Sequence, residues 1–340
     1  MMKRIIVILL IFLGIQLKAQ DVVFSQFSNT TIMINPAITG NYLGVVRTTL
    51  NQRVQYADFG LPYNTSMITV DKSIRRKGKR RDRISYGAYA VNDRAYTQDR
   101  IELRQYSISL GYHKLLEKKK YKHKFLSIGL QNGFASRIAL LDNFSFDRQI
   151  TQNGFDPTID NGERFAKESF GYPTMNIGLL YTFADSSFKK PIVNFNFGYG
   201  MFNTIPVKEA VTSINQSRLK ARHHFNTSII YWFVGTKAFI KADALFSLQG
   251  NSAQLKTRLI LDYWYNRKYA FLAGFNMNAA RSIGPVLGLG YKNVNITYSI
   301  DFAKQDRLGY YIANEITFVY LNPMPGREKI YALRAGDAKI

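Results

Sequence analysis

The chain has 340 residues, of which 46 are Lys or Arg, 23 are Asp or Glu and none is Cys. With 46% hydrophobic and 14% aromatic residues it is not an intrinsically disordered chain, despite a formal net charge of +23. The missing cysteine excludes disulfide scaffolds, thiol catalysis, thiolate metal sites and a lipid-modified cysteine anchor. The basic excess leaves three classes of partner open, namely nucleic acid, an anionic membrane surface or an acidic protein.

The first nineteen residues have the composition of a secretory signal peptide. Lys3 and Arg4 precede an apolar run at 5–13, and Ala19 provides the small residue expected at a cleavage site. This run is too short for a transmembrane helix, which needs about 20 apolar residues. We therefore predict a signal peptide at 1–19 and an exported mature chain. That chain keeps 43 basic and 23 acidic residues, a charge of +20, and its export argues against nucleic acid as a partner.

Residues 20–43 show no regular alternation of polar and apolar side chains, and we predict a periplasmic N-terminal arm there. Pro36 and Gly40 favour a tight turn that leads the arm into the following sheet, although a plain connecting turn would look the same. Two short motifs stand in this arm: Phe24-Ser25-Gln26-Phe27, and Asn35-Pro36-Ala37 followed after two residues by Gly40.

The sequence from 44 to 321 alternates with a period of two, which is typical of β-strands with one apolar and one polar or small face. Between 269 and 277, for example, the odd positions are Tyr, Phe, Ala, Phe and Met. The spacing of about twenty residues per strand leaves room for the ~10 residues that cross a bilayer. We predict about fourteen strands, at 44–56, 64–74, 84–94, 101–115, 124–138, 173–183, 191–201, 219–234, 236–247, 253–265, 268–280, 283–291, 293–302 and 310–321.

Two architectures fit such strands, a soluble sandwich and a membrane barrel. Aromatic residues at strand ends, such as Tyr231, Tyr263 and Tyr291, and the alternation of long and short connections favour the barrel. We therefore predict an all-β fold, a transmembrane antiparallel β-barrel of the outer membrane spanning 44–321. Its polar lumen would hold charges that can pair across it: Arg47, Arg53, Lys237, Lys241, Asp243, Lys256, Arg258, Asp262, Asp301 and Glu315.

An even number of strands brings both chain ends to one side, which we predict to be the periplasm. The longest connections, 139–172 and 202–218, would then face outward, and the tail 322–340 would be periplasmic. Basic residues gather in the periplasmic turns, either as solvated tips beside lipid headgroups or as a docking surface for an acidic partner. The candidate partner-binding residues are Arg75, Arg76, Lys77, Lys79, Arg80, Arg81, Lys118, Lys119 and Lys120.

No residue pattern predicts catalysis. The histidines are His113 and His123, which we place in the lysine-rich turn, and His223 and His224, which point to opposite faces of a strand. The electropositive setting of His113 and His123 makes general-base catalysis conceivable but unspecific, and His223 and His224 have no acidic or Ser partner at a fixed spacing. The HExxH, GxSxG and P-loop motifs do not occur. We expect neither an enzyme nor a cofactor nor a metal site; a membrane-embedded hydrolase is the least favoured alternative.

The two arm motifs, followed by Arg53-x-Gln55 and by Ser-Met-Ile-Thr-Val-Asp at 66–71, resemble the N-terminal signature of the PorP/SprF family of Bacteroidota. The resemblance implies an accessory outer-membrane barrel of type IX secretion and gliding motility. The implied partners are a large secreted adhesin with a type IX C-terminal domain and periplasmic secretion or motility machinery, for which the basic tail at 323–340 is a candidate contact. The alternating pattern alone equally allows a porin or a channel for hydrophobic solutes, gated by the arm and the long loop.

Overall fold

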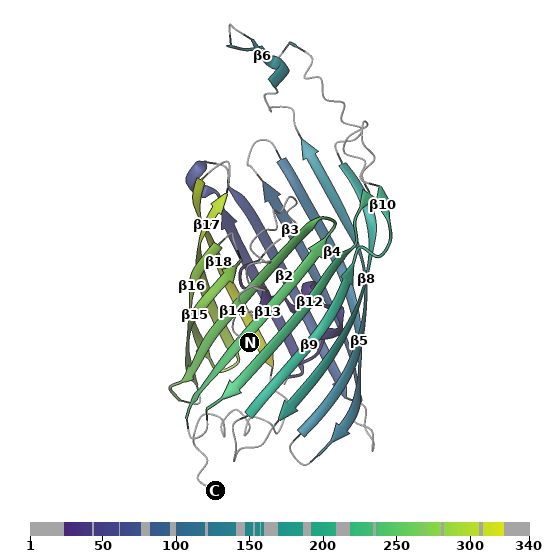
Figure 1. Cartoon of the computed structure of the whole chain (residues 1–340), viewed down its shortest axis with the longest axis vertical. Helices are drawn as coiled ribbons and strands as arrows, with labels where there is room; N and C mark the ends of the chain where they lie inside the picture. The colour runs from purple at the N-terminus through teal and green to yellow at the C-terminus, as the bar shows by residue number, and fades with distance from the viewer. Residues whose placement is uncertain are drawn as a thin grey trace, which may run out of the picture.

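Fourteen antiparallel strands close into a tilted barrel (Figure 1) in the part of the chain that the computed structural model describes. The described residues are 24–42, 44–60, 62–75, 82–95, 100–119, 122–140, 147–151, 154–156, 158–159, 169–185, 192–208, 218–233, 236–266, 268–279, 282–305 and 309–322. The barrel strands are β1 Val46–Gln55, β2 Tyr63–Arg75, β3 Arg83–Ala95, β4 Arg100–Lys118, β5 Lys122–Leu140, β8 Ser169–Asp185, β9 Ile192–Phe202, β12 Arg222–Trp232, β13 Ala238–Gln249, β14 Ser252–Trp264, β15 Tyr269–Asn278, β16 Ser282–Tyr291, β17 Val294–Gln305 and β18 Gly309–Asn322.

The apolar side chains of these strands face outward. In β4, Ile108 is 67% exposed while its neighbour Ser109 is fully buried, and in β16 Leu287 is 65% exposed. A soluble sandwich would bury these residues, whereas a membrane barrel presents them to lipid and keeps the polar face inside. The predicted fold class is therefore confirmed, and each predicted strand overlaps one strand of the barrel. Among the described residues, no helix has the length and apolar character needed to cross a membrane.

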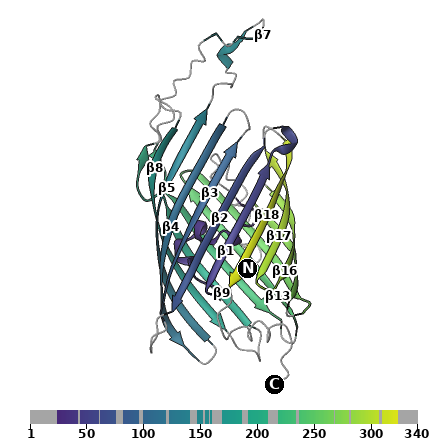
Figure 2. The same cartoon turned by 180° about the vertical axis from the view of Figure 1, so that it is seen from behind.

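The seam of the barrel is the pair formed by β1 and β18, which Figure 2 shows side by side. Val46 lies opposite Asn322 at one end of the seam, and Gln55 lies opposite Ala313 at the other. Closure pairs every strand on both edges, as hydrogen-bonding groups in a membrane require. We name the end at which β1 begins and β18 ends the terminal rim, and the opposite end the loop rim.

The two longest connections leave the loop rim, between β5 and β8 and between β9 and β12, at the end opposite to the chain ends, as strand parity predicted. β4 and β5 have 19 residues each, several more than the alternating segments predicted. The described parts of the long connections add two small hairpins that the sequence did not predict. These hairpins are β6 Ile150–Thr151 with β7 Gly154–Phe155, and β10 Val207–Lys208 with β11 Arg218–Leu219.

The N-terminal segment differs from the expected arm, because its described residues lie inside the barrel (Figures 1 and 2). Residues 24–42, here named the plug, form the short turns η2 Phe27–Asn29, α2 Thr31–Ile34 and η3 Pro36–Ile38. Two further single turns, η4 Ala57–Phe59 and η5 Asp147–Gln149, lie in connections. The predicted signal peptide at 1–19 and the tail at 323–340 lie outside the described residues.

Candidate functional site

The plug is held in the lumen by polar contacts to strands on opposite sides of the barrel. Its own turns are short because its sequence favours local caps over a continuous helix. The Asn35 side chain accepts a hydrogen bond from the Ala37 amide at 2.9 Å, and Pro36 takes the first position of η3, where its missing N–H costs nothing. Thr30 and Thr39 donate their hydroxyls to carbonyls three residues earlier, at Phe27 and Pro36, both at 2.8 Å.

The first anchor joins the start of the plug to the barrel seam. Glu315 of β18 accepts the amides of Ser25 and Gln26 at 2.6 and 3.0 Å. Arg53 of β1 reaches Glu315 and Asp301, both at 3.1 Å, and the Ser25 hydroxyl also contacts Arg53 and Asp301. Gln26 is fully buried. Two buried carboxylates are thus shared by one guanidinium and the plug backbone, an arrangement in which each charge has partners.

The second anchor is a close approach of backbone to backbone. A Cβ at Gly129 of β5 would lie 2.2 Å from both the Ala37 nitrogen and the Pro36 carbonyl carbon, and one at Gly178 of β8 would lie 2.0 Å from the Asn35 side-chain oxygen. Only glycine leaves room for the plug at these places. The Asn35 amide group, fully buried, donates to Leu179 O at 2.9 Å and to the Asn226 side chain at 3.0 Å.

The third anchor fixes the end of the plug to β2, β3 and β4. The Thr39 carbonyl accepts hydrogen bonds from Ser85 Oγ at 2.6 Å and from His113 Nε2 at 2.9 Å. The Gly40 amide donates to Asp71 at 2.7 Å, and Asp71 is also held by the guanidinium of Arg47 at 2.7 and 2.9 Å. Gly40 has a φ of +68°, the left-handed region that glycine adopts without strain.

Apolar side chains of the plug pack against the few apolar residues that point inward. Phe24 and Ile32 form one buried cluster with Met67, Tyr89 and Val91 of β2 and β3. Phe27 and Ile34 form a second cluster with Leu245 of β13. The plug is therefore amphipathic, with apolar contacts to two walls and polar anchors between them.

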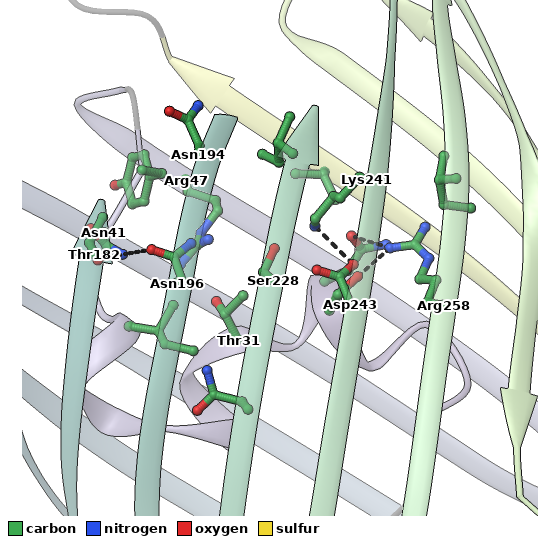
Figure 3. Close-up of a pocket in the computed structure, with 18 of the residues that line it drawn as sticks. Thr31, Asn41, Arg47, Thr182, Asn194, Asn196, Ser228, Lys241, Asp243 and Arg258 are labelled. Carbon is green, nitrogen blue, oxygen red and sulfur yellow. Dashed lines mark hydrogen bonds and ion pairs between the residues drawn. The ribbon is translucent and has the colours of Figure 1, made fainter. Parts of the chain in front are cut away.

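A cavity of about 590 Å³ remains between the plug and the terminal rim (Figure 3). Lys241 lies 3.4 Å from Asp243 on one wall, and the neighbouring Arg258 donates to Ser28 of the plug at 2.5 Å. Three strands along the same wall, Asn41 of the plug donates to Thr182 of β8 at 3.1 Å. A cavity of this size matches the sites that hold small ligands.

Of the other residues predicted to line the lumen or to carry the family motif, some lie inside the barrel and one does not. Lys256 is buried beside a small space that Ser25 and Asp301 also line. Gln55 accepts a hydrogen bond from Arg53 at 3.4 Å, at the end of β1. The prediction that Lys237 lies in the lumen is wrong. Lys237 lies in the turn before β13, where it donates to the exposed carbonyl of Tyr265 at 3.2 Å.

The candidate partner-binding residues belong to two turns of the terminal rim, between β2 and β3 and between β4 and β5. Lys118 and Lys119 are described, and Lys119 pairs with Glu117 at 2.8 Å, as does Lys124 at 2.6 Å. Arg75 ends β2, and nothing is described of its side chain. The remaining candidates, Arg76, Lys77, Lys79, Arg80, Arg81 and Lys120, lie outside the described residues.

Two histidines hold the plug, a role that the sequence did not indicate. His113 is fully buried in β4, inside the lumen and not in the lysine-rich turn, with Ser127 Oγ 2.7 Å from its Nδ1. His224 of β12 donates from Nδ1 to Ile34 O at 2.9 Å, while His223 points outward beside Tyr199. In the sequence, both histidines stand at strand positions that alternate with the apolar outward-facing residues, and this alternation could have indicated that they point into the lumen. No described residues form a group of three His, Asp or Glu placed to hold a metal ion.

A closed barrel with an apolar outer face, a charged lumen and a folded N-terminal plug is a membrane β-barrel of the outer-membrane type. Residues 16–320 match the family described as type IX secretion system membrane protein PorP/SprF, and the chain belongs to this family. The resemblance found in the plug motifs is thereby confirmed. No curated protein sequence matches the chain significantly.

Several solved structures share the barrel fold at low identity. The toluene transporter TbuX of Ralstonia pickettii has 11% identity and a TM-score of 0.45, with 90% of this chain and 96% of that one covered. The toluene transporter TodX of Pseudomonas putida has 10% identity and a TM-score of 0.44, covering 86% and 92%. CdiB from Escherichia coli has 7% identity and a TM-score of 0.44, covering 81% and 63%. These likenesses concern the fold alone.

Proposed function

We propose that this barrel is an accessory component of type IX secretion and gliding motility, supporting the export and surface attachment of a partner adhesin or another large secreted protein. Membership of the PorP/SprF family supports the secretion role. The observation that carries the accessory role is the plug, which is bonded to opposite walls of the lumen through Glu315, Asn226 and Asp71. A plug bonded across the lumen favours a protein that binds partners at its two rims over one that passes solutes through the barrel.

We further propose that a signal peptide exports the chain and that the terminal rim faces the periplasm. Basic residues at this rim, including Lys118 and Lys119, would then meet periplasmic machinery or anionic headgroups. The secreted partner would engage the loop rim through its C-terminal domain, where the long connections and the two small hairpins stand. No catalytic step is proposed, since His113 and His224 are buried and contact plug carbonyls.

Purification from mild detergent tests the partner role. The chain, tagged at its C-terminus, should co-purify one large secreted protein, and cells lacking the chain should lose that protein from their surface. Lys118→Glu should weaken recovery of periplasmic partners, and the loss should shrink in high salt because such contacts are screened. Lys304→Glu makes the same charge change in β17, near the loop rim, and serves as the matched control. Absence of any enriched secreted protein, with unchanged surface display in the deletion strain, would contradict the proposal.

A transport channel is the second candidate function, and it is favoured by the cavity of about 590 Å³ between the plug and the terminal rim. Planar-bilayer recordings separate the two functions. A steady conductance with a defined solute preference in the unmodified protein would support transport, whereas a closed barrel would support the accessory role.

A further inference from the structure

Four inward side chains gather where the cavity meets the terminal rim. Trp232 of β12 lies opposite Phe239 of β13, and Phe239 lies opposite Asp262 of β14, so the three form one row across neighbouring strands. The rings of Trp232 and Phe239 are 4.2 Å apart between centroids. Trp264 stands two residues beyond Asp262 on the same face of β14, and all four side chains line the cavity.

Asp262 stands out among the charges of this cavity. Its side-chain oxygen Oδ1 is buried and has no hydrogen-bond partner among the described residues, and the residue is only 6% exposed. Asp243 Oδ2 also has no hydrogen-bond partner in the described part of the chain, but Lys241 lies 3.4 Å from it and supplies a counter-charge. Arg47 is paired with Asp71, and Arg258 donates to Ser28. A buried carboxylate without a partner is costly, and this cost is removed when a cation binds beside it.

The surroundings of Asp262 favour an organic cation over a hydrated metal ion. Indole and phenyl rings attract ammonium and guanidinium groups through their faces. Phe239 lies opposite Asp262, Trp264 follows two residues later in β14, and Trp232 lies beyond Phe239 in the same cavity lining. The described residues supply no further carboxylate or histidine cluster that could complete a metal site. A cavity of about 590 Å³ has room for the chain that carries the cation.

We propose that the cluster of Trp232, Phe239, Asp262 and Trp264 is a binding site for an ammonium or guanidinium group, such as a lysine or arginine side chain, which enters the lumen from the terminal rim. Asp262 provides the counter-charge, and the aromatic rings surround the aliphatic stem and the charged head. The cavity wall beyond it presents the side-chain amides of Asn194 and Asn196 (Figure 3), which can hydrogen-bond a peptide backbone.

Intrinsic fluorescence tests the site directly, because the chain contains two tryptophans and both line this cavity. The purified full chain in detergent is titrated with butylamine, with acetyl-Ala-Lys-Ala-amide and with the neutral acetyl-Ala-norleucine-Ala-amide. We expect a saturable change with both amines and none with the neutral peptide. Tighter binding of the lysine peptide than of butylamine would assign the ligand to a peptide chain, and equal binding would assign it to small amines; either result supports the site.

Asp262→Asn should weaken binding of the lysine peptide at least about tenfold, since the substitution removes the negative charge that balances the bound ammonium group. Asp156→Asn makes the same change in a connection at the loop rim and should bind like the unmodified protein. Should Asp262→Asn fail to fold, Phe239→Leu, which keeps an apolar side chain but removes the aromatic ring, is expected to weaken binding several-fold. The proposal is overturned if the neutral peptide binds as well as the lysine peptide, if no titration saturates, or if a folded Asp262→Asn protein binds unchanged.

Discussion

Adding one methyl group to the barrel wall at Gly129 should release the plug while leaving the barrel intact. In Gly129→Ala the new Cβ would lie 2.2 Å from the Ala37 nitrogen and from the Pro36 carbonyl carbon, both backbone atoms of the plug. Ordinary contact between such atoms needs at least about 3.4 Å, so the plug must retreat by roughly 1.2 Å. The wall cannot retreat instead, because β5 is paired along its length with β4 and β8.

That retreat breaks the hydrogen bonds that hold Asn35. The Asn35 amide donates to Leu179 O and to Asn226 at 2.9 and 3.0 Å, and a shift of roughly 1.2 Å along these bonds lengthens them to about 4.1 and 4.2 Å, beyond hydrogen-bonding distance. Each buried polar group left without a partner costs about 1–3 kcal/mol. Two such groups give about 2–6 kcal/mol, which lowers the ratio of docked to undocked plug by about 30-fold or more.

Two measurements report whether the plug is docked in the lumen. Limited proteolysis with mass spectrometry should find cleavage within 24–42 in Gly129→Ala well before it appears in the unmodified protein, and bilayer recordings should show new openings. The shift in gel mobility between unheated and boiled samples should persist, because the strand pairing is unchanged. Gly171→Ala is the control, since it adds the same methyl group to β8 at a place where the nearest atoms all belong to the exposed side chain of Phe134 and none belongs to the plug. A Gly129→Ala protein as protected and as closed as the unmodified one would refute the reasoning.

Three further variants test other parts of the structure. Gly40→Ala forces a side chain into a φ of +68° with its Cβ 2.3 Å from that of Ser85, and should lower stability in urea by about 1–3 kcal/mol. Arg53→Met leaves two buried carboxylates of the seam without their cation and should cost about 3–5 kcal/mol, measured the same way; an unchanged midpoint would contradict the ion-pair network. Leu287→Arg, on the outward face, should cost about 2–4 kcal/mol and reduce the yield of heat-modifiable barrel from membranes, whereas normal yield would argue against lipid contact there.

The strands could be predicted from the sequence because their pattern is local. Each residue of a strand points to the face opposite to that of its neighbour, so the alternation in β15 or β17 reveals the strand without knowledge of its partners. Whether the apolar face of a strand points outward or inward cannot be read from this local pattern. Its outward direction was inferred from aromatic strand ends and connection lengths, and the outward position of Ile108 and Leu287 now establishes it.

The plug motifs were recognisable as a family signature, yet their place was not predictable. Asn35, Pro36 and Gly40 indicate a turn, and a turn in an arm outside the barrel would need the same residues. What brings them inside is the set of contacts from distant strands, such as Glu315 with Ser25, His113 with Thr39, and Gly129 with Pro36. Residues separated by up to 290 positions meet there, and no sequence spacing encodes such a meeting.

The sequence by itself excluded classes of protein through its composition, and it determined the alternating strands and the family signature, because these depend on residue type and on a period of two. Only the tertiary structure decided that the arm is a plug, that two histidines hold it, and that Trp232, Phe239 and Asp262 form one row beside a cavity. The physical reason is register. Barrel closure fixes which residues lie opposite one another, and that pairing creates the anchors and the cavity.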